Sequence, residues 1–323
     1  MQKSVETPFE THFEKEVYQG LTDFPKHLSS KYFYDAKGDK LFQDIMAMPE
    51  YYLTDCEFEI FEEHKKEITN HFSSASGKFS LIELGAGDGK KTKILLKQLV
   101  EDNVSFKYQP IDISRNVLNH LESSLENQIP DLEVETRHGT YFEALEKIHS
   151  QNGVRKVILF LGSNIGNLLH PQAIEFLKSV QELMIEDDLF FVGFDQKKSP
   201  QTILDAYNDK TGITEAFNKN VLTRINSEMD GNFNIDNFLH WEVYNPETGT
   251  AKSYLVSKKQ QSVHIEKLNL KVDFKAWETI HTEISQKYDD ATINWLAEKS
   301  GLQIETFFRD KHDYYRNYIF KKR

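Results

Sequence analysis

The chain has 323 residues, 39% of them hydrophobic and 12% aromatic, so it can bury a sizeable core in one large or two smaller domains. Its 39 Lys and Arg against 51 Asp and Glu give a net charge of −12, which excludes a broad basic face for nucleic acid. The single cysteine, Cys56, excludes an internal disulfide and is typical of a reducing compartment. No signal peptide and no apolar run near the ~20 residues of a membrane span is present. We therefore expect a soluble, cytoplasmic protein without nucleic-acid or membrane partners.

Short apolar runs alternate with amphipathic stretches in the middle of the chain, which is typical of βαβ units and a parallel sheet. Strands are predicted at residues 79–84, 106–111, 132–136, 157–161 and 189–194. Helices are predicted between them at residues 91–100, 117–125 and 173–184. This pattern predicts an α/β fold with a doubly wound sheet.

The alternation of apolar runs and amphipathic stretches ends after residue 194. A helix is predicted at 214–229, followed by strands at 240–244, 252–256, 262–265 and 268–274, which reads as an antiparallel α+β insert. A helix at 292–299, with Gly301 as its C-terminal cap, and strands at 302–308 and 315–320 then return to the α/β pattern. One α/β domain interrupted by a second domain is the predicted plan.

A glycine-rich turn follows the first predicted strand, with the sequence ELGAGDGKKT at residues 83–92. Glycines at such a turn let the backbone approach a ligand and aim helix N-terminal amides at it. A nicotinamide-dinucleotide fingerprint would need glycine at Lys90, whereas alternate glycines after an acidic residue resemble the first motif of S-adenosylmethionine (SAM) methyltransferases. Asp112 ends the next strand, where an acid can accept both ribose hydroxyls. Each feature alone has a plainer explanation, a tight βα turn or a helix cap, but together they favour SAM binding.

Several separated blocks resemble one family, the histidine-specific methyltransferases of ergothioneine biosynthesis. The blocks occur in order from about residue 25 to the C-terminus, at residues 32–42, 48–54, 160–167, 206–209, 217–222 and 282–288. The resemblance implies a SAM-methyltransferase (Rossmann-like) domain formed by residues 70–200 and 288–323. It also implies an inserted α+β substrate-binding domain formed by residues 1–69 and 201–287.

The family resemblance implies transfer of three methyl groups from SAM to the α-amino group of L-histidine, giving hercynine. It implies roles near the amino and carboxylate groups for Tyr34, Asn167 and Tyr207, with Tyr34 and Asn167 as the catalytic pair. Positions matching the imidazole contacts are Tyr51, Glu283 and Ser285. The cofactor-binding set comprises Glu83, Gly85, Gly87, Lys91, Asp112, Tyr141 and Phe142. We expect no metal ion in the site, and we expect the enzyme to be a monomer.

The residue types suit this chemistry. Methyl transfer needs an aligned neutral amine rather than a strong base, and an amide and a phenol do not stabilise the ammonium form as a carboxylate would. Glu283 can accept an imidazole N–H, while Ser285, two residues along an extended segment, can serve the other nitrogen. Taken alone, Tyr51 would be an ordinary core aromatic, Glu283 and Ser285 a solvated strand edge, and Asn167 a turn residue.

Two positions depart from the family pattern. Tyr141 stands where an acidic residue usually holds the adenine amino group, and Ser253 replaces a methionine that often lies against the imidazole. Two other functions therefore stay open: methylation of another amino acid, aromatic or modified, and a non-catalytic binding protein on the same fold. The glycine turn together with Asp112 argues against the second of these.

Overall fold

The structure, a computed structural model, describes residues 9–75, 77–140, 143 and 154–323. Contacts divide the chain into two compact units, each made of two segments. Met1–Tyr51 and Ser199–Ile284 form one, which we call the three-stranded unit after its larger sheet. Tyr52–Lys198 and Ser285–Arg323 form the other, the seven-stranded unit.

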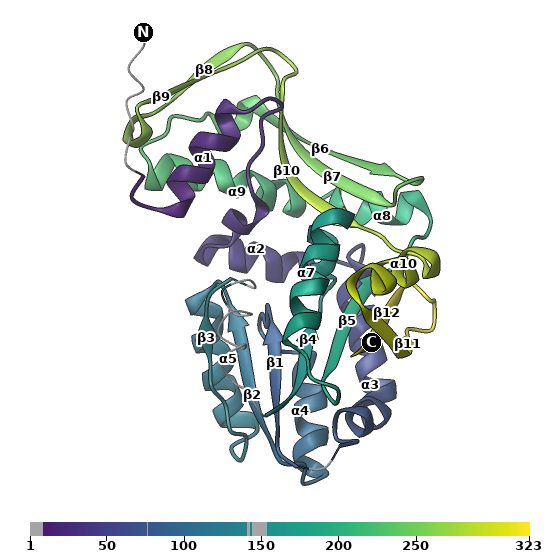
Figure 1. Ribbon diagram of the computed structural model, residues 1–323. Helices are drawn as coiled ribbons and strands as arrows, with labels where there is room; N and C mark the ends of the chain where they lie inside the picture. The colour runs from purple at the N-terminus through teal and green to yellow at the C-terminus, as the bar shows by residue number, and fades with distance from the viewer. Residues whose placement is uncertain (1–8, 76, 141–142, 144–153) are drawn as a thin grey trace. The chain divides into compact units, whose positions relative to one another are not determined.

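The seven-stranded unit is built on one mostly parallel sheet (Figure 1). Its strands lie in the order β11-β12-β5-β4-β1-β2-β3, and β12 is antiparallel to both of its neighbours, β11 and β5. The central strands are fully buried or nearly so because both faces are covered. The bounds are β1 Phe79–Leu84, β2 Phe106–Asp112, β3 Arg137–His138, β4 Arg155–Phe160, β5 Leu189–Asp195, β11 Leu302–Arg309 and β12 Tyr315–Lys322.

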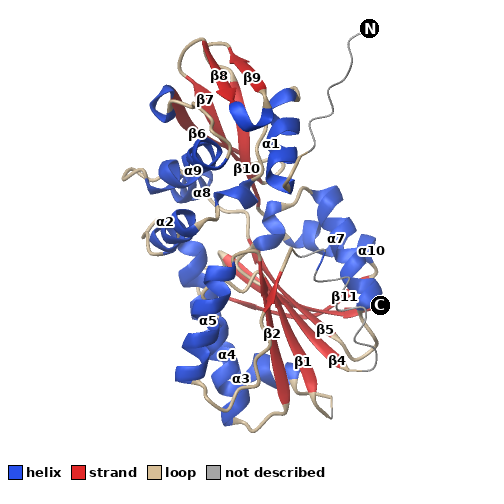
Figure 2. Cartoon of the chain, turned by 90° about the vertical axis from the view of Figure 1, so that its left-hand side faces the viewer, coloured by secondary structure: helices blue, strands red, loops and turns tan. Residues whose placement is uncertain are grey.

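Helices cover both faces of this sheet, which confirms the predicted doubly wound α/β fold (Figure 2). On one face lie α3 (Tyr52–Phe72), α4 (Thr92–Glu101) and α5 (Arg115–Gln128). On the other lie α7 (His170–Leu183) and α10 (Asp290–Ser300). Gly301 ends α10 with a φ of +72°, as predicted for a C-terminal glycine cap.

Two features of this unit differ from the prediction. Residues 132–136 make only one isolated bridge, Tyr108 to Val134, and the assigned edge strand is the shorter β3. The domain boundary was expected at residue 69, yet α3 falls in the seven-stranded unit. The reason is packing, since Phe61 and Phe72 of α3 contact the ring of Phe191 on β5.

Strand order reverses next to β1, whose two neighbours are β2 on one side and β4 on the other. In doubly wound sheets a ligand binds outside the carboxyl ends of the strands at such a reversal. The glycine turn after β1, Asp112 at the end of β2 and the turn after β4 all lie at this edge. The sheet topology therefore brings the residues predicted to bind the cofactor to one edge of the sheet.

The three-stranded unit combines helices with two antiparallel sheets, and its strands confirm the predicted α+β pattern. The larger sheet has the order β10-β7-β6, and β8 pairs with β9. Alternate β6 residues, including Phe238 and His240, are buried, as expected for a sheet with one covered face. The bounds are α1 His12–Thr22, η1 Ser30–Phe33, α2 Ala36–Met46, α8 Pro200–Tyr207, α9 Ile213–Glu228, β6 Phe238–Asn245, β7 Thr250–Ser257, β8 Gln261–Ile265, β9 Leu270–Phe274 and β10 Thr279–Gln286.

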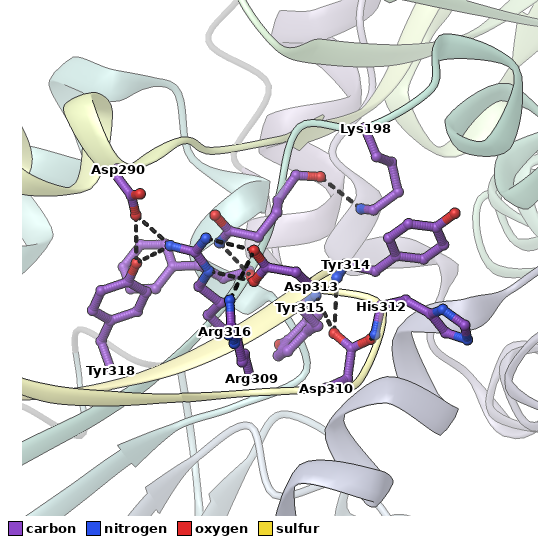
Figure 3. Close-up of polar contacts among 12 residues, drawn as sticks. Lys198, Asp290, Arg309, Asp310, His312, Asp313, Tyr314, Tyr315, Arg316 and Tyr318 are labelled. Carbon is purple, nitrogen blue, oxygen red and sulfur yellow. Dashed lines mark hydrogen bonds and ion pairs between the residues drawn. The ribbon is translucent and has the colours of Figure 1, made fainter.

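The turn between β11 and β12 is fixed by one buried carboxylate. Asp310 accepts hydrogen bonds from the backbone N–H groups of His312, Tyr314 and Tyr315 at 2.7–2.8 Å (Figure 3). The turn places the ring of Tyr314 5.3 Å from the Lys198 ammonium. The C-terminal hairpin thus reaches the carboxyl end of β5, where Lys198 follows.

Candidate active site

The glycine turn after β1 has the backbone shape that its sequence predicts. Gly85, Gly87 and Gly89 have φ values of +75°, +56° and +65°, a region that favours glycine. The Gly85 N–H donates to the Ile111 carbonyl at 2.8 Å, which holds the turn against the end of β2. A Cβ on Gly89 would come within 2.5 Å of Leu121, whereas one on Gly87 would meet nothing within 4 Å. Leu121 therefore packs against the turn at Gly89, whereas the turn is open at Gly87.

Asp112 lies beside this open turn. One carboxylate oxygen accepts from the Gly87 N–H at 3.0 Å and the other from the Ser114 N–H at 2.9 Å. Ser114, not Asp112, caps helix α5, since its hydroxyl accepts from the Val117 N–H. The helix-cap explanation of Asp112 is therefore wrong. A partly exposed carboxylate beside an open glycine turn fits the ribose of the expected cofactor.

Glu83 lies beneath the turn, with an exposed fraction of 2%. Its carboxylate accepts hydrogen bonds from the hydroxyls of Thr92, at 2.7 Å, and Tyr108. Burial raises the pKa of Glu83 to about 7 despite these hydrogen bonds. Glu83 is placed to support the turn from inside the unit.

Lys91, at the start of α4, forms an ion pair with Glu57 of α3, whose side chain is fully buried. The same carboxylate accepts from the Gly162 N–H at 2.9 Å and from the Asn317 amide at 2.8 Å. A Cβ on Gly193 would come within 2.5 Å of it. Glu57 thus ties Lys91 to the turn after β4. Sequence reasoning missed this residue, although its spacing from Ile60 and Phe61 on the buried face of α3 was a usable signal.

The structure brings the turn that carries Asn167 against the segment that carries Ser285. Asn167 ends the short helix η2 (Asn164–Asn167) after β4. A Cβ on Gly166 would come within 3.0 Å of the Gln286 carbonyl oxygen, so the two backbones are in close approach. The Tyr288 hydroxyl also donates to the Ile165 carbonyl at 3.1 Å. Ser285 is buried, and its hydroxyl accepts from the Lys287 ammonium at 2.6 Å.

Three predicted substrate residues of the three-stranded unit share one aromatic cluster. Phe42 of α2 makes edge contacts with Tyr34, at 5.5 Å between ring centroids, and with Tyr51, at 6.5 Å. Tyr51 in turn contacts Tyr207, the last residue of α8, at 6.2 Å. Phe217 of α9 lies 5.4 Å from Tyr34 and fixes the other side of that ring. Rings held in this way present hydroxyls at defined points.

Glu283 lies in a polar group next to this cluster along α9. Its carboxylate lies 3.4 Å from the Asn218 amide nitrogen and 3.3 Å from the Ser253 hydroxyl. Ser253 also donates to the buried Glu242 at 2.6 Å. Thr282 donates to the Asn218 oxygen at 2.8 Å, which orients the amide nitrogen toward Glu283. Sequence reasoning did not assign site roles to Asn218 and Glu242, because both are joined to Glu283 only by the fold.

Tyr141 and Phe142, expected to bind the cofactor, lie outside the described residues. Within the described ranges, no group of His, Cys, Asp and Glu side chains could hold a metal ion. In the same part of the chain, no helix is long and apolar enough to cross a membrane.

Comparison with known proteins gives relatives along nearly the whole chain. A histidine N-alpha-methyltransferase of Mycolicibacterium smegmatis is 33% identical over 92% of this chain and 90% of its own length. One of Mycobacterium tuberculosis is also 33% identical, over 92% of this chain and 91% of its own length. An L-tryptophan methyltransferase of Psilocybe serbica is 29% identical over 90% of this chain and 87% of its own length.

The family profile described as "Histidine-specific methyltransferase, SAM-dependent" matches residues 13–322. This match confirms the resemblance seen in the sequence blocks and the prediction of SAM as the cofactor. The chain belongs to the histidine-specific, SAM-dependent methyltransferase family.

Proposed function

We propose that this enzyme transfers three methyl groups in succession from SAM to the α-amino nitrogen of L-histidine, with hercynine as the product. SAM supplies an electrophilic methyl group on a sulfonium. In this proposal the seven-stranded unit binds the cofactor through Gly85, Gly87, Lys91 and Asp112, and the three-stranded unit binds most of the amino acid. Glu83 supports the glycine turn.

The observation that carries the choice of substrate is the polar environment of Glu283. Asn218, oriented by Thr282, lies 3.4 Å from its carboxylate in a partly buried place, and the Ser253 hydroxyl, which donates to Glu242, lies 3.3 Å from it. A carboxylate held there favours a ring with an N–H to donate and disfavours an apolar ring, which would leave it desolvated and unpaired. An imidazole satisfies this requirement and still leaves a second nitrogen for Ser285.

The proposed chemistry needs a neutral amine held in line with the methyl group. Asn167 and Tyr34 supply an amide and a phenol, which can accept from the amino group without the full negative charge that would favour its ammonium form. Tyr207 is assigned to the carboxylate of the substrate and Tyr51 to the imidazole side. The rigid ring contacts among Tyr34, Phe42, Tyr51 and Tyr207 support a prearranged site, because little ordering is then needed on binding.

Methylation of an aromatic amino acid is the second candidate, and the relative named for L-tryptophan methylation gives it weight. Ser253, in place of the methionine of the family pattern, was the reason to keep it open. In the structure Ser253 donates to Glu242 and also contacts Glu283, so this substitution adds polar groups to the site. That environment favours histidine over tryptophan.

Calorimetry separates these candidates. SAM should bind the free enzyme, and L-histidine should bind the enzyme saturated with S-adenosylhomocysteine at least tenfold more tightly than L-tryptophan. Tighter binding of tryptophan would favour the second candidate. Binding of SAM with neither amino acid bound or methylated would instead indicate the non-catalytic alternative.

A further inference from the structure

A buried charged group lies behind Ser285 in the seven-stranded unit and has no role in the proposed reaction so far. The side chains of Lys287 and of Asp195, the last residue of β5, are both fully buried. They form an ion pair with 2.7 Å between Lys287 Nζ and Asp195 Oδ2. The Lys287 ammonium also donates to the Ser285 hydroxyl at 2.6 Å. One ammonium therefore joins the end of β5 to a residue expected to contact the imidazole.

Asp195 has further partners that keep it ionised. It forms a second ion pair with Lys198 and accepts from the Tyr52 hydroxyl at 2.8 Å. Burial acts to raise the pKa of Asp195, but the two ammonium groups outweigh it and hold the pKa below its usual value. We therefore expect Asp195 to keep its ion pair with Lys287 when Lys198 is replaced, and its ion pair with Lys198 when Lys287 is replaced.

The backbone makes the position of Lys287 rigid. Tyr288 N–H donates to the Asp195 carbonyl at 2.9 Å, and Lys197 N–H donates to the Tyr288 carbonyl at 2.6 Å. The segment after β10 therefore forms an isolated bridge, Gln196 to Tyr288, beside the end of β5. This pairing fixes the backbone next to Lys287, and burial together with the ion pair to Asp195 restrains its side chain.

The hydrogen-bond polarity that results is specific. An ammonium has three donors and no lone pair, so in the contact with Lys287 the serine oxygen must accept. The single serine proton is then directed elsewhere, and the nearby positive charge makes it a stronger donor. The ammonium also weakens the remaining lone pair of the oxygen as an acceptor, so Ser285 is better suited to donate to a ring nitrogen that carries a lone pair than to accept from an N–H.

We propose that Lys287, anchored by Asp195, is a positioning residue that makes Ser285 a stronger donor and a weaker acceptor, and so favours substrates whose ring offers an acceptor nitrogen. This inference rests on the proposed histidine methylation. It adds that the ring is bound as neutral imidazole, with a lone pair toward Ser285. A protonated ring would turn a second N–H toward Ser285 and lose that hydrogen bond.

A double-mutant cycle on the full-length enzyme tests the inference. Lys287→Met should raise KM for histidine on the order of tenfold, as expected for one lost hydrogen bond to a polarised donor, with a smaller change in kcat and an unchanged KM for SAM. In a Ser285→Ala background the same change should alter KM for histidine less than twofold. Lys287→Arg, which keeps a cationic donor, should restore part of the loss.

Lys198→Met is the matched control, because it removes the other ammonium on Asp195 and leaves the contact with Ser285. It should leave KM for histidine within about twofold of wild type. Lys287→Gln is the second neutral variant if Lys287→Met does not fold. An equal effect of the Lys287 change in both backgrounds, or an equal effect of Lys198→Met, would overturn the inference.

Substrate analogues give an independent readout. Thiazolylalanines carry a ring nitrogen with a lone pair and no N–H, whereas pyrrolylalanines carry an N–H and no lone-pair nitrogen. The wild-type preference for thiazolyl over pyrrolyl substrates should fall at least threefold in Lys287→Met, and an unchanged preference would contradict the proposal. Failure of the wild-type enzyme to methylate histidine at all is a different result, since it would contradict the proposed function itself.

Discussion

The glycine turn with its supports and the polar group around Glu283 are assembled in different ways. The turn lies in one stretch of sequence after β1, and its supports are buried charges, the Lys91–Glu57 pair and Glu83. The residues around Glu283 come from α9, β6, β7 and β10 and meet through neutral amide and hydroxyl donors. The first region depends on local backbone shape and ion pairing, the second on tertiary packing.

This difference predicts different responses to substitution. Changes around the glycine turn should alter stability or SAM binding and leave the choice of amino acid unchanged. Changes around Glu283 should alter that choice and leave SAM binding unchanged. Three measurements test the division, and a fourth tests the burial of His240.

The largest effect is expected from Glu57→Ala. The change leaves the Lys91 ammonium without its carboxylate and removes the acceptor of the Gly162 N–H and the Asn317 amide. Breaking a buried pair in this way costs about 3–5 kcal/mol of unfolding free energy. Urea denaturation of Glu57→Ala and of Glu62→Ala, an α3 residue with a 44% exposed side chain, gives the comparison. Equal losses in the two variants would contradict the structural role of Glu57.

Glu283→Ala should lower kcat/KM for histidine by an amount equivalent to about 1.5–3 kcal/mol, the value of a charge-assisted hydrogen bond. The relative rate with tryptophan or phenylalanine should rise, because a desolvated carboxylate no longer opposes an apolar ring. Glu247→Ala, in the exposed turn between β6 and β7, is the control. If the ratio of kcat/KM for histidine to kcat/KM for tryptophan is the same in Glu283→Ala and wild type, Glu283 does not contact the substrate side chain.

Asp112→Ala should weaken SAM binding by about 2 kcal/mol, from two ribose hydrogen bonds at about 1 kcal/mol each. The ratio of histidine to tryptophan turnover should stay the same. Calorimetric dissociation constants for SAM, with Asp131→Ala as the exposed control, test this expectation. A dissociation constant equal to that of wild type would refute the assignment of Asp112 to the ribose.

The smallest effect concerns pH and His240, which is buried on β6 near Asp209, Glu215 and Lys219. Burial lowers the pKa of His240 to about 4, so the unfolded chain, with its ordinary histidine pKa, takes up a proton first as the pH falls. Stability that is present above about pH 6.5 is lost as the pH drops toward 4. In His240→Gln the decrease in unfolding free energy from pH 8 to pH 6 should therefore be smaller by about 1 kcal/mol.

The comparison with wild type is needed because Glu83 acts in the opposite direction. Its pKa is raised by burial from 4.5 to about 7, so the stability that it contributes is fully present below about pH 4.5 and is lost as the pH rises through 7. Both proteins contain Glu83, and its contribution cancels in the difference. Identical pH profiles for the two proteins would show that His240 is not buried as a neutral ring.

Local patterns were enough to predict most of the α/β fold. The apolar runs located four central strands to within two residues, and the alternating run at 283–285 is part of β10. Helices α1 and α2 were not predicted, although Thr11 and Asp35 carry the side-chain caps that start them. The glycine turn and Asp112 were predicted because a few neighbouring residues determine their geometry.

The remaining site residues could not be derived in the same way. Tyr34, Tyr51 and Tyr207 were predicted from family blocks, because nothing in the spacing of three tyrosines shows that Phe42 joins them. Glu57, Asp195 and Lys287 were missed, since a charged residue in a helix or strand usually faces water. Their burial depends on partners more than 90 residues away, such as the Asp195–Lys287 pair, and only the fold brings these together.

The central claim is that the amino group of free histidine is the methyl acceptor. Mass spectrometry of the purified enzyme incubated with SAM and an equimolar mixture of the free amino acids tests it most directly. The account predicts that histidine is consumed and that a product with three added methyl groups, all on the α-amino nitrogen, accumulates in proportion to S-adenosylhomocysteine. Methylation of tryptophan or another amino acid in preference to histidine, or of a ring nitrogen of histidine, would contradict it.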